Sequence, residues 1–192
     1  MRNVALLLIL AAPVCVLAQS GPALANATVS VPLNQNFGGS WAGQLEYKDY
    51  SNGERVLLPT WVETAPDPSG NAVTFRYTYD DGPTKIVRET VLLTFVGANA
   101  TVQSISSIVG DKNQPAEHYS VTGLELFRKV YRGTLVLTGT GKDNDKPADV
   151  RITITLRRNL YTWVKETRAA GTLAPFAFRD GYTFTRIAMP KG

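Results

Sequence analysis

The sequence predicts an all-β protein, a single antiparallel up-and-down β-barrel of about 8 to 10 strands. Two observations lead to this prediction. Apolar and polar residues alternate with a period of two along several segments, which places one set of side chains on a buried face and the other in water. Turn signals such as Ser51-Asn52-Gly53 and Asp81-Gly82-Pro83 divide the chain at short intervals, as in antiparallel sandwiches and barrels.

The first residues of the chain have the pattern of a secretory signal peptide. Arg2 supplies a positive charge, Val4 to Ala12 form an apolar run, and Val16-Leu17-Ala18 fits the small-residue cleavage pattern. A second candidate cleavage site follows Ala25. The apolar run is too short for a membrane-spanning helix, which needs about 20 apolar residues. We therefore expect an exported protein, periplasmic or secreted, with no transmembrane segment after cleavage of residues 1–18.

The rest of the chain is predicted to form one domain. Residues 19–36 show no period and are interpreted as an irregular N-terminal segment. Residues 37–192 are predicted to be the β-barrel domain, because no linker composition interrupts them. At roughly 170 residues the mature chain is long enough to bury a core without further help.

The strands are predicted from their alternation and their β-branched and aromatic residues. The clearest are Trp41 to Lys48, Val73 to Asp80 and Val150 to Arg157. The segment from Lys85 to Phe95 is rich in Thr and Val and is interpreted as a strand. The segment from Gly123 to Tyr131 fits either one turn of helix or a bent strand.

Several kinds of site are not expected from this sequence. Cys15 is the only cysteine, so the mature chain would have no disulfide, thiol nucleophile or cysteine metal site. No phosphate-binding glycine loop, dinucleotide fingerprint or nucleophile elbow is present, and we expect no cofactor. The formal net charge is only +4 and its cations are scattered, so nucleic acid is not an expected partner.

His118 and an acidic turn are the remaining candidates for chemistry. If Tyr119 faces the interior, His118 faces outward, and a single histidine is a poor basis for a zinc site. The run from Lys142 to Lys146 offers oxygen ligands, but it lacks the distal glutamate of a calcium loop and its lysines would repel a cation. We interpret it as a solvated hairpin tip and expect no metal site.

The apolar set of each strand defines the predicted interior. Following the alternation also brings two cations, Lys165 and Arg186, onto aromatic faces, where they must reach water, pair, or stack on a ring. The candidate ligand-binding residues are Trp41, Tyr47, Phe75, Tyr77, Tyr79, Tyr119, Trp163, Lys165, Tyr182 and Arg186.

Two of these positions resemble the lipocalin and wider calycin pattern. In that family a Gly-x-Trp opens the barrel and an arginine of the final strand packs across the tryptophan. Gly39-Ser40-Trp41 and Arg186 are similar to these positions. The resemblance implies a barrel closed between its first and last strands, with a cavity inside. The usual lipocalin disulfide and the family's second motif are missing, so the resemblance is one of architecture.

The sequence favours a non-enzymatic function. The first hypothesis is a barrel that binds a small, partly apolar ligand, with Lys165 and Arg186 suited to an anionic end of that ligand. The alternative is an isomerase or cyclase that uses the same cavity without metal or cysteine, with Lys165 as its base. A third hypothesis is a structural or assembly factor of the cell envelope. The oligomeric state is not indicated.

Overall fold

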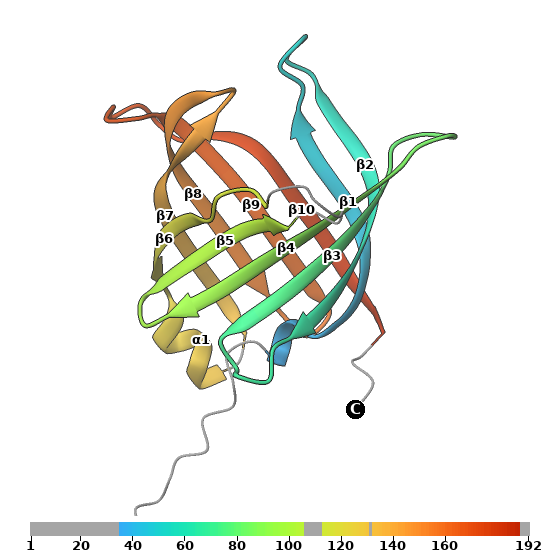
Figure 1. Ribbon diagram of the computed structural model, residues 1–192, viewed down its shortest axis with the longest axis vertical. Coiled ribbons are helices and arrows are strands. Elements are labelled where there is room, and N and C mark those ends of the chain that lie inside the picture. Colours follow the sequence, from blue (N-terminus) through green and yellow to red (C-terminus); the bar gives the residue numbers. More distant parts are fainter. Residues whose placement is uncertain (1–34, 106–112, 131, 189–192) are drawn as a thin grey trace, which may run out of the picture.

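The computed structural model describes residues 35–105, 113–130 and 132–188. Within them, ten strands form one closed antiparallel barrel (Figure 1). The predicted signal peptide lies outside the described residues. The elements are η1 (Gln35–Phe37), β1 (Gly39–Lys48), β2 (Arg55–Pro66), β3 (Ala72–Asp80), β4 (Ile86–Val96), β5 (Asn99–Ile105), β6 (Glu117–Thr122), α1 (Leu124–Val130), β7 (Gly133–Asp143), β8 (Lys146–Leu156), β9 (Leu160–Ala169) and β10 (Ala177–Ala188).

The topology is an up-and-down meander. Each strand pairs with the next along the chain, and β10 returns to pair with β1. The closing register places Trp41 opposite Arg186 and Leu45 opposite Tyr182. Closure pairs the outer side of β1 with that of β10, so neither end strand is left as a free edge. The predicted fold class is therefore confirmed.

The alternation of side chains determines which face of each strand is buried. On β3, Val73, Phe75, Tyr77 and Tyr79 are at most 5 % exposed, and the residues between them face solvent to a greater degree. β8 repeats this pattern. The strand predicted around residues 85–95 is confirmed as β4, and the segment left open at residues 123–131 forms the helix α1.

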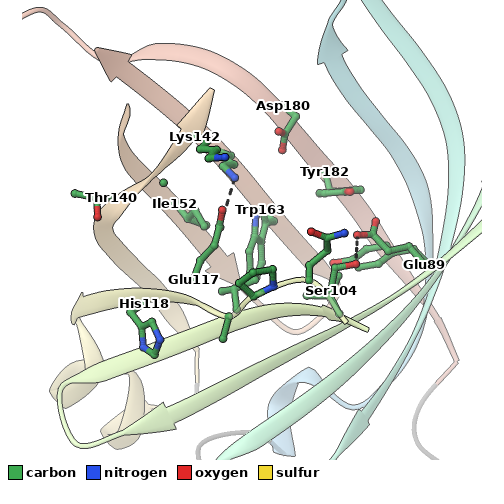
Figure 2. Close-up of a pocket in the computed structure, with 18 residues that line it drawn as sticks. Glu89, Ser104, Glu117, His118, Thr140, Lys142, Ile152, Trp163, Asp180 and Tyr182 are labelled. Atoms are coloured by element: carbon green, nitrogen blue, oxygen red, sulfur yellow. Dashed lines mark hydrogen bonds and ion pairs between the residues drawn. The ribbon is translucent and has the colours of Figure 1, made fainter. Parts of the chain in front are cut away.

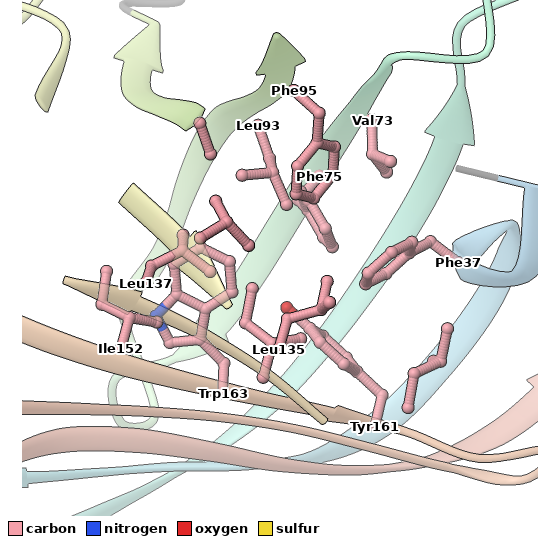
Figure 3. Close-up of a cluster of buried hydrophobic side chains, with 14 of the residues drawn as sticks. Phe37, Val73, Phe75, Leu93, Phe95, Leu135, Leu137, Ile152, Tyr161 and Trp163 are labelled. Atoms are coloured by element: carbon pink, nitrogen blue, oxygen red, sulfur yellow. The ribbon is translucent and has the colours of Figure 1, made fainter. Parts of the chain in front are cut away.

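One end of the barrel is closed from inside by aromatic rings. Both η1 and α1 lie at this end, the lower end of Figure 1. Phe37 from η1 stacks on Phe127 from α1 with ring centres 5.9 Å apart, and both side chains are 1 % exposed. Phe37 also meets the rings of Phe75 and Tyr161 edge-on. Figure 3 shows Phe37, Phe75 and Tyr161 with aliphatic residues of the core around them.

Trp41 and Arg186 contact each other at this closed end. The guanidinium carbon of Arg186 lies 3.9 Å from the centre of the Trp41 ring. This is the contact that the resemblance to lipocalins implies, on the first and last strands of the barrel.

The opposite end carries long hairpins, the upper end of Figure 1. The β7–β8 turn has φ values of 48° at Asn144 and 59° at Asp145, as a two-residue type I′ turn requires. Both residues are exposed, as expected of a solvated hairpin tip. Asp143 is the exception, because it accepts a hydrogen bond from Thr167 and pairs with Arg179.

Candidate ligand-binding site

The interior of the barrel has a filled lower half and a hollow upper half. A cavity of about 710 Å³ opens above the aromatic core. Its lining comes from β3, β4, β5, β7, β8, β9 and β10, and from residues 114–118 at the start of β6 (Figure 2). Because so many strands contribute, residues far apart in sequence meet around one space.

The inward residues of β7 become small in the upper half of the barrel, and one of them, Gly141, lines the cavity. On β7 the inward positions change from Leu135 and Leu137, both fully buried, to Gly139 and Gly141. A Cβ atom on Gly141 would lie 3.1 Å from a Val150 methyl group and 3.3 Å from a carboxylate oxygen of Glu117. The absence of a side chain at position 141 thus leaves room for the Glu117 carboxylate at the cavity wall.

Aromatic rings form the floor of the cavity. Tyr77 and Tyr182 stack with ring centres 4.9 Å apart, and Trp163 packs edge-on against Phe75 just below. Trp163 is 6 % exposed, and it lines the cavity together with Tyr77 and Tyr182. Rings that pack on one another in this way give a floor that is apolar and held in position.

A chain of hydrogen bonds joins this floor to Glu89 on the wall. The Tyr79 hydroxyl donates to Glu89 Oε2 at 2.8 Å. It therefore accepts from the Tyr182 hydroxyl, 2.9 Å away. The Ser104 hydroxyl donates to the other oxygen, Oε1, at 3.1 Å. Burial raises the pKa values of Tyr79 and Tyr182 far above the usual value of a tyrosine. Both hydroxyls therefore stay protonated and can donate hydrogen bonds.

A second polar group is centred on Glu117. Its carboxylate pairs with the ammonium of Lys165 at 3.6 Å and accepts a hydrogen bond from the Tyr119 hydroxyl. The side chain of Lys165 is 22 % exposed. An inward lysine must pair or reach water, and Glu117 at the beginning of β6 supplies the partner of Lys165. Lys165 is consequently an ion-paired group, not a free cation, at the cavity wall.

Asp180 is a third carboxylate at the wall. Desolvation raises its pKa from 3.8 to about 6, although the charges of Lys165 and Arg179 oppose this shift. Among the residues that the structure describes, no hydrogen bond or ion pair to its carboxylate is found. Asp180 is the strand neighbour of Lys165 in the β9–β10 register.

The ten candidate residues fall into four groups. Tyr77, Trp163, Lys165 and Tyr182 line the cavity. The others lie in the filled core, behind the lining or beside it. Trp41, Phe75 and Arg186 belong to the closed end, Tyr79 and Tyr119 hydrogen-bond to lining carboxylates, and Tyr47 lies opposite Asp180 on β1.

His118 lies at the rim of the cavity. It is exposed, whereas Tyr119 is buried, as the alternation predicted. Its neighbour Glu117 faces the other side of the strand and does not orient it. Within residues 35–105, 113–130 and 132–188, no group of three or more His, Cys, Asp or Glu side chains is placed to hold a metal ion.

The carboxylates Glu89, Glu117 and Asp180 were not identified as site residues from the sequence. Each follows the inward alternation of its own strand, two residues from an inward tyrosine in the case of Glu117 and Asp180. This two-residue spacing was the sequence signal that could have identified them as inward-facing. A carboxylate beside an inward tyrosine on the same strand face must either reach water or find a partner inside the barrel.

Comparisons with known proteins do not assign a family to this chain. No family model matches it, and no curated protein matches it. None of the helices in the described part of the chain is long and apolar enough to span a membrane.

Proposed function

We propose that this chain is an exported, lipocalin-like barrel that binds a small, partly apolar ligand in the upper half of its interior. The observation that carries the proposal is the cavity of about 710 Å³ above an aromatic floor. Ligand sites are typically concave spaces of about 300 to 1,000 Å³, mostly apolar, with a few placed polar groups. The cavity has that size, and its floor is aromatic, whereas its wall carries three carboxylates and two lysines.

The arrangement of the floor supports binding over simple core filling. Trp163, Tyr77 and Tyr182 are packed from below and present their remaining surface to the cavity. A ligand would therefore meet rings whose positions are already set, which lowers the entropic cost of binding. The filled lower half limits how deep the cavity is, because Phe75 and Tyr161 occupy the space beneath Trp163.

Tryptophan fluorescence offers a test, because the three tryptophans lie in different places. Trp163 lines the cavity, Trp41 lies in the closed end, and Trp61 is 44 % exposed on the outer surface. In a Trp61→Phe background, a neutral environment-sensitive dye such as Nile red should quench Trp163 and gain fluorescence. Mass spectrometry of the native protein would in parallel detect a ligand carried through purification.

A matched pair of variants on β4 locates the binding. Val91 lines the cavity, and Leu92 is its neighbour on the outer face. Val91→Phe should reduce the space available and weaken dye binding about tenfold or more, equivalent to about 1.4 kcal/mol. Leu92→Phe should bind the dye like the parent protein. Equal binding by both variants, or no binding by the parent, would refute the proposal.

The second candidate function is an isomerase or cyclase that acts in the same cavity. The observation that favours it is Asp180, a carboxyl with a pKa of about 6 on the cavity wall beside Lys165. A group that titrates near neutral pH is suited to general acid–base catalysis. If this function is correct, the small molecule recovered from Asp180→Asn would differ in isomer composition from that recovered from the parent. Identical recovered molecules would favour binding alone.

A further inference from the structure

The charges that face the cavity are unevenly paired. Three carboxylates, Glu89, Glu117 and Asp180, line it together with two lysines, Lys142 and Lys165. Lys165 pairs with Glu117 at 3.6 Å. In the described part of the chain, neither Glu89 nor Asp180 has a cationic group within ion-pair distance. The wall therefore holds two carboxylates without a cation of their own.

Glu89 is held in a fixed orientation with acceptor capacity to spare. Each of its oxygens accepts one hydrogen bond, from Tyr79 and from Ser104. A carboxylate has about four acceptor positions, so these two bonds leave about half of them unused. The side chain lines the cavity, and the two donors fix the carboxylate against the wall before any ligand enters.

Asp180 faces the same space from β10. Figure 2 shows Asp180, Tyr182 and Glu89 following one another along the cavity wall. Asp180 and Tyr182 share a strand face, and Tyr182 is joined to Glu89 through the hydroxyl of Tyr79. A carboxylate withdrawn from water without a partner is costly, and a cationic ligand would remove much of that cost.

The aromatic floor lies between these carboxylates and the core. Trp163 and Tyr182 line the cavity, and the faces of such rings attract cations as well as apolar groups. Of the cations that could favour an anionic ligand, Lys142 is exposed to solvent, and the other two are already engaged. Arg186 stacks on Trp41 at the closed end, and Lys165 is paired with Glu117.

We propose that the ligand is an amine: a protonated ammonium group on an aromatic or otherwise apolar body. The ammonium binds at Glu89 and Asp180, and the body packs on Trp163 and Tyr182. This inference rests on the proposed binding function and adds the chemical class of the ligand.

The experiment uses three probes with the same naphthalene body and different charges. They are 1-naphthylmethylamine, 1-naphthalenemethanol and 1-naphthoic acid, titrated at neutral pH into the Trp61→Phe protein with Trp163 fluorescence as the signal. The amine should bind about tenfold or more tightly than the alcohol, since a charge-assisted contact contributes about 1.5 to 3 kcal/mol. The acid should bind more weakly than the alcohol.

Charge-removing variants place the preference at the two carboxylates. Glu89→Gln and Asp180→Asn should each reduce the ratio of amine to alcohol affinity by about threefold or more. Glu63→Gln removes an exposed carboxylate on the outside of β2 and should leave the ratio unchanged. Circular dichroism verifies that each variant is folded, and the ratio within one variant is independent of its stability.

The outcomes separate the two proposals. If the alcohol binds and Val91→Phe weakens it, but the amine shows no advantage or the acid binds best, the amine inference is overturned and the binding function remains. If an amine preference persists unchanged in both Glu89→Gln and Asp180→Asn, the assignment to these residues is overturned. If no naphthalene probe and no Nile red binds the parent protein, the binding function itself fails.

Discussion

Arg186 lies across the ring of Trp41 with its guanidinium carbon 3.9 Å from the ring centre. The same guanidinium donates to three backbone carbonyls, those of Arg158 at 2.9 Å, Asn36 at 3.0 Å and Gly38. One side chain on the last strand thereby ties together the beginning of β1, the segment before it and the β8–β9 turn. Arg186 thus lies at the closed end and is not among the residues that line the cavity above.

Arg186→Lys should destabilise the barrel, although the charge is preserved. Lysine has no planar fork of donors and cannot reach all three carbonyls while it lies on the Trp41 ring. We expect a loss of about 2 kcal/mol in the free energy of unfolding, measured by urea denaturation, and a larger loss for Arg186→Ala. Arg157→Lys, at an exposed position, is the matched control. If both lysine variants unfold alike, the guanidinium contacts contribute little.

Gly43 should be intolerant of any side chain. A Cβ atom at this position would lie 1.9 Å from the Thr183 carbonyl oxygen and 2.9 Å from the Phe184 Cα atom, both on β10. Backbone atoms cannot move aside as a flexible side chain can, so β1 and β10 would have to separate. Gly43→Ala should cost at least about 3 kcal/mol in thermal or urea unfolding. Gln44→Ala, the exposed neighbour on β1, should change stability little.

The strand faces were predictable because they follow from a local rule. Alternation alone places Phe75, Tyr77 and Tyr79 on one face of β3, and burial confirms it. The pairing of first and last strands was predictable from the residues at positions 41 and 186. The sequence did not decide between a helix and a bent strand for the segment that forms α1. Seven residues are too few for their periodicity to distinguish the two.

The position of the cavity depends on distances along the strands and on neighbours that are remote in sequence. Arg186 is four residues beyond Tyr182, which is roughly 13 Å along a strand, so the two residues belong to opposite halves of the barrel. Gly141 on β7 faces the same hollow as Ser104 on β5, whereas the space beside Gly139 is filled by the ring of Tyr119. A single sequence does not show which small residues will meet across the barrel.

Asp180→Asn should make the protein more stable at neutral pH and leave it unchanged near pH 4. The pKa of Asp180 is about 6 in the folded protein and ordinarily 3.8. The folded state therefore binds this proton more tightly, and the parent loses stability as the pH rises from about 4 to 7. Two pKa units correspond to about 2 to 3 kcal/mol.

Denaturation at pH 4 and at pH 7.5 measures this difference. The comparison needs both proteins at both values, because Lys165, Arg179, Glu89 and Asp143 also act on Asp180. Asp145→Asn, which removes an exposed carboxylate at the β7–β8 hairpin tip, is a control for a general effect of lost negative charge. A parent and an Asp180→Asn variant with the same dependence on pH would show that Asp180 is not desolvated.

The interior tyrosines should ionise only when the barrel opens. Burial raises the pKa of five of them far above 10, and hydrogen bonds or neighbouring carboxylates add to the effect in most cases; the five are Tyr77, Tyr79, Tyr119, Tyr161 and Tyr182. Because the folded state holds these protons more tightly, stability falls as the pH rises above 10.

In an absorbance titration of phenolate, five of the eight tyrosines should ionise together with alkaline unfolding. In denaturant all eight should ionise near pH 10. Ionisation of all eight near that value in the folded protein would mean that water reaches the rings around the cavity floor.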